Sequence, residues 1–169
     1  LAEQTLLKPL GIQPHQVFRM QGERQDRDQA ARDYEQLLPD VLDVVVLGMG
    51  EDGHTASLFP GHAALEERQR RVLAVVGPKP PPWRMTLTLP VLQAARKVLG
   101  LANGAGKRDI VARWRAGEDI PAGRVTQAEW MMDTVAAGQA AGGNTMSTAQ
   151  GERAQFGVLG MGVMGQNLA

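Results

Sequence analysis

A histidine that follows two acidic residues and several glycines is the first feature of this sequence that could carry chemistry. His54 lies in the segment 48–61, GMGEDGHTASLFPG, directly after Glu51, Asp52 and Gly53. An imidazole takes up and returns a proton near neutral pH, and a neighbouring carboxylate can fix its tautomer and stabilise its charged form. We therefore predict that His54 is a general base and that Asp52 orients it.

Three glycines of the same segment, Gly48, Gly50 and Gly53, favour tight turns and leave amide N–H groups close to a ligand. The segment follows residues 42–47 (LDVVVL), an unbroken apolar run that is typical of a strand covered on both faces. Ligands of parallel sheets bind beyond the carboxyl ends of the strands. We therefore expect the glycines to contact a substrate and to stabilise a developing oxyanion. The alternative is a loop in which the glycines only turn the chain and His54 bonds to backbone.

Two basic side chains are candidates for binding a phosphate. Lys107 ends the loop 103–107 (NGAGK), which links an expected strand to an expected helix, and a helix N-terminus attracts anions. Composition alone would make this loop a generic turn with a solvated lysine. Arg84 follows the prolines at 80–82, and a guanidinium can grip phosphate oxygens with two hydrogen bonds. An arginine at the edge of a strand, in solvent, is an equally good interpretation of Arg84.

Apolar periodicity alternates between the helix and strand patterns along the chain. The alternation predicts an α/β fold with a doubly wound, mostly parallel sheet and helices on both faces. The expected helices are 2–10, 24–38, 90–97, 107–115 and 129–137, and the expected strands are 15–20, 42–47, 71–76, 85–89 and 98–102.

Composition excludes several classes of function. The 169 residues contain 18 Lys and Arg, 18 Asp and Glu, and no Cys. A neutral balance argues against a nucleic-acid binder, and the lack of Cys excludes disulfides and thiolate metal sites. No metal site, membrane-spanning segment or signal peptide is predicted, and we expect a cytoplasmic protein. The oligomeric state is left open.

Several segments together resemble the 6-phosphogluconolactonase family. They are residues 47–61 (LGMGEDGHTASLFPG), 77–89 (GPKPPPWRMTLTL), 101–107 (LANGAGK), and 120–125 (IPAGRV) with 130–133 (WMMD). The resemblance covers about residues 1–138 and implies the Rossmann-like isomerase/lactonase fold. It also implies cofactor-independent hydrolysis of 6-phosphoglucono-1,5-lactone in the oxidative pentose phosphate pathway, with Lys107 as a phosphate ligand.

An amino-sugar-6-phosphate isomerase is the alternative within the same superfamily. The isomerase loop is similar, with DGH followed five residues later by Glu. This sequence has Phe59 at that distance from His54, and a phenyl ring cannot relay a proton. Phe59 therefore favours the lactonase.

The resemblance also implies that the lactonase-like domain is incomplete at its N-terminus. The family's first strand, its Ser/Gly-rich phosphate loop and an Asp-Glu-Arg segment would all precede residue 1. We expect a chain without them to be poorly stable and nearly inactive, because central strands would lose their neighbours.

The C-terminal part of the chain has a different composition. Residues 139–155 are rich in Gly, Ala, Ser and Thr and predict a flexible linker. Residues 156–169 place Gly160, Gly162 and Gly165 in a GxGxxG pattern after an expected strand, as in dinucleotide-binding domains. This stub resembles the start of 6-phosphogluconate dehydrogenase and implies NADP. Either the two enzymes are fused, or two neighbouring genes have been joined by error.

Overall fold

The computed structural model describes residues 2–138. The expected linker, 139–155, and the expected dehydrogenase stub, 156–169 with Gly160, Gly162 and Gly165, lie outside the described residues. The helices are α1 (Arg27–Leu37), α2 (Leu89–Ala94) and α3 (Arg108–Arg115), and the strands are β1 (Val44–Gly48), β2 (Val72–Val76), β3 (Trp83–Leu87), β4 (Lys97–Ala102) and β5 (Ala128–Met132). Single turns of 3-10 or π type lie at Glu3–Leu7, Pro14–Gln16, Ala63–Glu66, Ala105–Lys107 and Pro121–Arg124.

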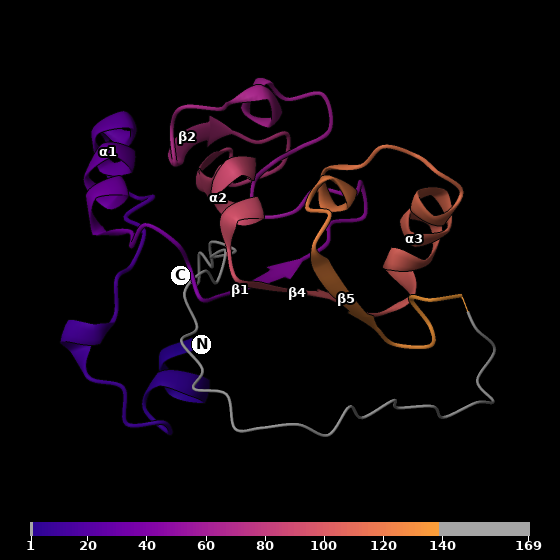
Figure 1. Cartoon of the computed structure of the whole chain (residues 1–169), viewed down its shortest axis with the longest axis horizontal. Helices are drawn as coiled ribbons and strands as arrows, with labels where there is room; N and C mark the ends of the chain where they lie inside the picture. The colour runs from indigo at the N-terminus through magenta and orange to yellow at the C-terminus, as the bar shows by residue number, and fades with distance from the viewer. Residues whose placement is uncertain (1, 139–169) are drawn as a thin grey trace.

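A parallel sheet with the strand order β1-β4-β5 forms the centre of the described structure (Figure 1). Gly48, the last residue of β1, lies opposite Leu101 of β4. Strands β2 and β3 form a separate antiparallel pair, and α2 and α3 lie over the same face of the parallel sheet in Figure 1. The predicted α/β fold with a mostly parallel sheet is confirmed.

The core consists of two apolar clusters that hold the carboxyl ends of β1 and β4 in place. The larger cluster joins β1, β4 and α2, and includes Val45, Leu92 and Val98, all fully buried. The smaller cluster packs Ile110 of α3 and Ile120 against the end of the sheet, with both side chains no more than 2% exposed. Burying each such aliphatic side chain stabilises the fold by roughly 1.5–3 kcal/mol.

The helix predicted for residues 129–137 is wrong. Residues Ala128–Met132 form β5, which pairs in parallel with β4. Trp130 lies opposite Gly100, where the absence of a side chain leaves room for the indole ring. Packing against a neighbouring strand thus overrides the helix propensity of Glu, Ala and Met in this segment.

The strand predicted for residues 15–20 is also wrong. A single 3-10 turn, Pro14–Gln16, stands at its start, and the side chain of Gln16 accepts a hydrogen bond from the backbone N–H of Gln13 at 2.9 Å. Val17 and Phe18 are exposed at 38% and 45%, and no strand of the described residues pairs with them. Apolar character without a pairing partner does not form a strand.

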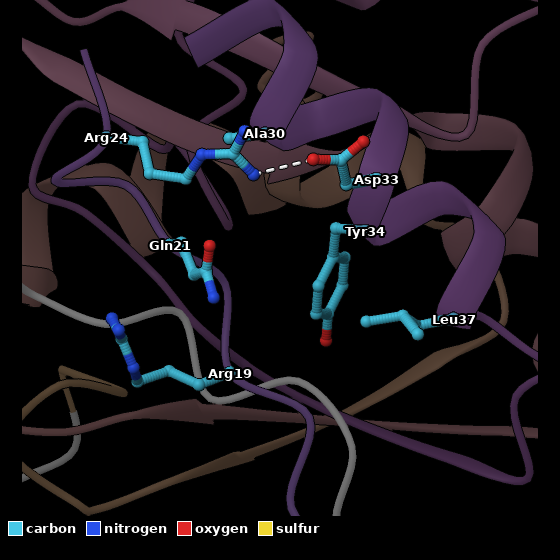
Figure 2. Close-up of a pocket in the computed structure, with 7 residues that line it drawn as sticks. All are labelled: Arg19, Gln21, Arg24, Ala30, Asp33, Tyr34 and Leu37. Atoms are coloured by element: carbon cyan, nitrogen blue, oxygen red, sulfur yellow. Dashed lines mark hydrogen bonds and ion pairs between the residues drawn. The ribbon is translucent and has the colours of Figure 1, made fainter. Parts of the chain in front are cut away.

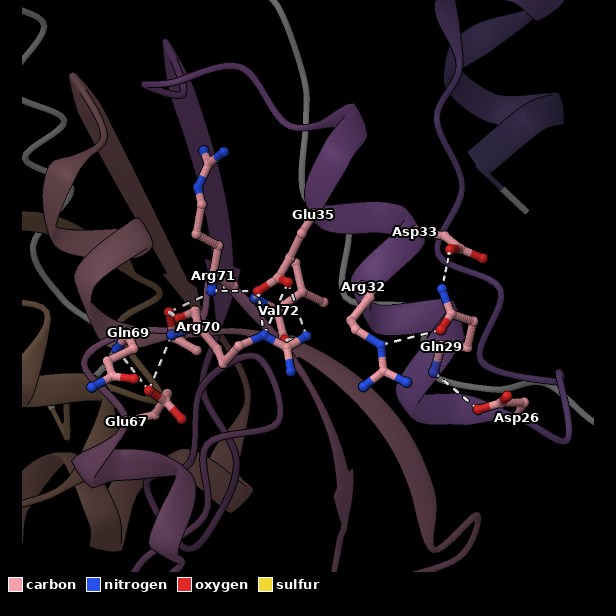
Figure 3. Close-up of polar contacts among 11 residues, drawn as sticks. Asp26, Gln29, Arg32, Asp33, Glu35, Glu67, Gln69, Arg70, Arg71 and Val72 are labelled. Carbon is pink, nitrogen blue, oxygen red and sulfur yellow. Dashed lines mark hydrogen bonds and ion pairs between the residues drawn. The ribbon is translucent and has the colours of Figure 1, made fainter.

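Glu35 of α1 links that helix to the start of β2 (Figure 3). Its carboxylate, 19% exposed, accepts hydrogen bonds from Arg70 Nε at 2.9 Å and from the backbone N–H groups of Arg71 and Val72 at 2.6 and 3.0 Å. Burial raises the pKa of Glu35, but the hydrogen bonds from Arg70 and the two amides outweigh burial and leave the pKa below its ordinary value.

Glu35→Gln is expected to lower the free energy of unfolding by about 1–3 kcal/mol at neutral pH, because buried donors lose a charged acceptor. The folded-state pKa is depressed, so this contribution is complete above the unfolded pKa and disappears as the pH falls through the folded pKa. Urea unfolding at several pH values checks this. Glu23→Gln, which removes an exposed carboxylate paired with Arg19, is the matched control and should change stability little. Equal effects of the two substitutions would contradict the prediction.

Candidate active site

His54 and Asp52 are in direct contact in the loop that follows β1. The Nδ1 atom of His54 lies 2.5 Å from Oδ1 of Asp52, and the two side chains are 23% and 31% exposed. Burial raises the pKa of Asp52, but hydrogen bonds from the ring and the backbone N–H of His54 outweigh it and leave the pKa below its ordinary value. An ionised Asp52 accepts a hydrogen bond from Nδ1–H of His54, so the lone pair of a neutral imidazole lies on Nε2.

Hydrogen bonds within the loop hold this pair in place. The N–H of Gly50 donates to the carbonyl of His54 at 2.8 Å, and the hydroxyl of buried Thr55 donates to the carbonyl of Gly48 at 2.8 Å. The carbonyl of Gly53 accepts from the N–H of Ala122 at 3.0 Å, which ties the loop to the turn before β5. The imidazole is therefore positioned by a closed hydrogen-bonded turn.

Two of the predicted glycines have structural reasons to be glycine. A Cβ atom at Gly50 would overlap the imidazole ring of His54 and lie 2.6 Å from Oδ1 of Asp52. Gly53 has φ +81°, which an L residue rarely adopts, and a Cβ atom there would lie 2.8 Å from Ile120. The N–H of Gly53 donates to the carbonyl of Gly50 at 3.0 Å. The N–H groups of Gly50 and Gly53 therefore both donate hydrogen bonds within the turn. These hydrogen bonds would have to break before either N–H group could stabilise an oxyanion.

The loop 103–107, which follows β4, contacts the loop that follows β1. A Cβ atom at Gly106 would lie 2.7 Å from Oε1 of Glu51, so the loops after β1 and β4 meet at this point. Lys107 is half-buried at the start of α3, and within residues 2–138 its ammonium group makes no hydrogen bond or ion pair. A lysine that has no ion pair among the described residues is available to bind an anion.

Asp133 is a residue of this edge that sequence reasoning missed. Its Oδ2 accepts the N–H of Gly104 at 2.9 Å and its Oδ1 accepts the N–H of Ala136 at 2.7 Å. These two amide bonds lower the pKa of Asp133. The residue fixes the loop that carries Lys107, but it lies far away in the sequence, and no local pattern indicates the contact.

Arg84 is connected to His54 through an aromatic ring. The rings of Phe59 and His54 lie 4.7 Å apart, and the guanidinium carbon of Arg84 lies 5.4 Å from the centre of the Phe59 ring. Arg84 also donates from Nε to the carbonyl of Pro81 at 3.1 Å and from Nη2 to that of Lys79 at 3.2 Å. A guanidinium has five N–H donors, so three of them make no hydrogen bond among residues 2–138 and can serve a ligand.

The side chains of the other two histidines have different settings. His62 accepts the N–H of Ala64 on Nδ1 at 3.1 Å and caps a short turn, and His15 is exposed. Within the described part of the chain, no three His, Cys, Asp or Glu side chains lie close enough to hold a metal ion. No helix among residues 2–138 has the length and apolar character needed to cross a membrane.

A small pocket beside α1 lies apart from these side chains (Figure 2). Its volume is about 70 Å³, and it is lined by Arg19, Gln21, Arg24, Ala30, Asp33, Tyr34 and Leu37. Arg24 pairs with Asp33 at 2.6 Å, as the dashed line in Figure 2 shows, and Arg19 pairs with Glu23 at 2.5 Å. Both guanidinium groups are therefore neutralised by this chain's own carboxylates.

Comparison with known proteins shows to which family the chain belongs. The family described as glucosamine-6-phosphate isomerases/6-phosphogluconolactonase matches residues 1–135. The chain belongs to this family. Within the family it is 46% identical over 105 residues to 6-phosphogluconolactonase of Rattus norvegicus, covering 57% of this chain and 40% of that protein. It is 38% identical over 160 residues to 6-phosphogluconolactonase of Streptomyces coelicolor, covering 82% of this chain and 61% of that one.

The fold of this family member is also found in solved structures. The crystal structure of the devB protein superposes with a TM-score of 0.71 at 28% identity, over 81% of this chain and 64% of that chain. The chain spans about half the length of the curated relatives it matches.

Gly50→Ala is expected to separate His54 from Asp52, because the added methyl group would occupy the position of the ring. The imidazole ¹⁵N signals of His54 report which nitrogen carries the proton, and we expect them to lose the pattern of an Nδ1–H bonded to a carboxylate. Gly22→Ala is the matched control, because a Cβ atom at Gly22 meets nothing within 4 Å. An unchanged His54 spectrum in Gly50→Ala would show that this contact does not position the ring.

Proposed function

We propose that this chain carries the proton-transfer site of a 6-phosphogluconolactonase, which hydrolyses 6-phosphoglucono-1,5-lactone to 6-phosphogluconate. The contact between His54 and Asp52 at the carboxyl end of β1 is the observation that carries the proposal. Relatives named 6-phosphogluconolactonase support the substrate. Lys107, which follows the loop that meets Glu51, and Arg84, which lies over the Phe59 ring, support a phosphorylated substrate.

In the proposed reaction, Nε2 of His54 removes a proton from a water molecule as that water attacks the lactone carbonyl carbon. The new C–O bond gives a tetrahedral intermediate, and the bond from that carbon to the ring oxygen then breaks. The imidazolium returns its proton to the departing ring oxygen, so the base is regenerated. Asp52 stabilises the imidazolium and fixes the tautomer. The step needs only water, substrate and residues of this chain.

An isomerase reaction is less compatible with the same site. Moving a proton between sugar carbons requires a second proton-transfer group, and the fifth residue after His54 is Phe59. Its ring is 3% exposed and in contact with the imidazole. No ionisable group occupies that position, which favours lactone hydrolysis over amino-sugar isomerisation. The assignment of residues 156–169 to the start of an NADP-dependent dehydrogenase, joined here by a fusion or by an error between neighbouring genes, stays a prediction.

His54→Gln is expected to lower the turnover of 6-phosphoglucono-1,5-lactone by roughly 100-fold or more in the full-length protein, with KM nearly unchanged. Glutamine keeps the approximate size but cannot take the proton from water. Initial rates of lactone hydrolysis measure the effect, and His15→Gln, at an exposed histidine, is the control. Turnover that survives His54→Gln would remove the assignment.

Lys107→Gln is expected to raise KM for the phosphorylated lactone roughly tenfold or more, since a charge-assisted hydrogen bond contributes about 1.5–3 kcal/mol. Hydrolysis of unphosphorylated glucono-1,5-lactone should be unaffected. Lys97→Gln is the matched control. Lys97 is the first residue of β4, at the opposite end of that strand from the loop that carries Lys107, and it pairs with Glu129. Equal effects of Lys107→Gln on both lactones would argue against phosphate binding.

A further inference from the structure

The ring of Phe59 contacts both His54, the proposed proton-transfer group, and Arg84, a proposed phosphate-binding group. One contact joins it to the imidazole of His54, at 4.7 Å between ring centres and a 40° tilt. The other joins it to the guanidinium of Arg84, at 5.4 Å. Proton transfer and phosphate binding therefore involve two side chains that share one neighbour.

The position of this ring is set by packing from several elements. Phe59 is only 3% exposed, although it lies in a loop and not in a helix or strand. A Cβ atom at Gly77, just after β2, would lie 2.8 Å from Cε2 of Phe59 and 3.1 Å from Nε of Arg84. The bare backbone at Gly77 therefore lets the phenyl ring and the guanidinium approach each other closely.

The contact has an electrostatic consequence as well as a steric one. The face of an aromatic ring attracts cations, so the guanidinium of Arg84 is stabilised over it, and an imidazolium formed on His54 is stabilised at the same ring. The same ring lines an open pocket of about 390 Å³ together with Gly77 and Pro78.

We propose that Phe59 is a positioning residue that sets the spacing between the proton-transfer group His54 and the phosphate-binding group Arg84. A lactone whose phosphate is held by Arg84 can place its carbonyl at Nε2 of His54 only if that spacing matches the length of the sugar. A rigid ring with two χ angles fixes such a spacing at little cost in entropy. This inference rests on the proposed function and assigns Phe59 no contact with the substrate.

Phe59→Met tests the proposal, because methionine fills much of the same volume but has no ring face. In the full-length protein we expect KM for 6-phosphoglucono-1,5-lactone to rise roughly fivefold and kcat to fall roughly tenfold. For unphosphorylated glucono-1,5-lactone only kcat should fall, since that substrate has no phosphate for Arg84. A purely structural role would lower the active fraction and leave KM for both lactones unchanged, which would overturn the proposal.

Two further variants keep the test decisive if Phe59→Met does not fold. In Gly77→Ala, the added methyl group would crowd the Phe59 ring and the Arg84 guanidinium. This variant should raise KM for the phosphorylated lactone alone. In an Arg84→Met background, Phe59→Met should no longer raise KM, because the residue acts through the guanidinium. An unchanged KM in Gly77→Ala, or additive effects in the double variant, would overturn the proposal.

The controls separate this inference from the proposed function. Phe18→Leu, at an exposed phenylalanine, and Gly22→Ala, at an unconfined glycine, should behave like the parent protein. A folded full-length parent protein that hydrolyses neither lactone would refute the proposed function itself. A parent protein that hydrolyses the phosphorylated lactone, with Phe59→Met and Gly77→Ala indistinguishable from the controls, would refute only the role of Phe59.

Discussion

Parallel pairing of β1 with β4 is the constraint on which the candidate site depends. Because both strands run in the same direction and Gly48 lies opposite Leu101, the loops that follow them leave the sheet at the same edge. Glu51 meets Gly106 there, and Lys107 follows at the start of α3. An antiparallel pairing would place the two loops at opposite ends, and a slip of one residue would turn buried side chains outward.

The chemistry of the site depends on the partial burial of His54 and Asp52 in the loop that follows β1. His54 is accessible enough to meet water, yet the closed turn around it leaves its ring little freedom. Asp52 loses hydration in the same place and is held ionised by the hydrogen bonds that His54 donates. The pair therefore combines a fixed tautomer with an Nε2 atom that makes no hydrogen bond among residues 2–138, which is the arrangement that general base catalysis requires.

Local sequence patterns predict β1 and the contact between Asp52 and His54. Other parts of the fold and of the candidate site depend on contacts between segments that are distant in the sequence. The apolar run in β1 and the GEDGH segment after it predict a strand followed by a loop that joins Asp52 to His54, and the structure contains both. The strand β5 could not be predicted from its own residues, because Trp130 is placed by Gly100 of a neighbouring strand. The stacking of Arg84 on Phe59 likewise depends on the fold of the loop between β2 and β3, which has no periodic pattern.

The most direct measurement of the central claim is a crystal structure of the full-length protein with 6-phosphogluconate bound. We expect the C1 carboxylate within hydrogen-bond distance of Nε2 of His54, and the phosphate against Lys107 and Arg84. A phosphate bound at His54, or a sugar acid seated away from the loops that follow β1 and β4, would contradict this expectation.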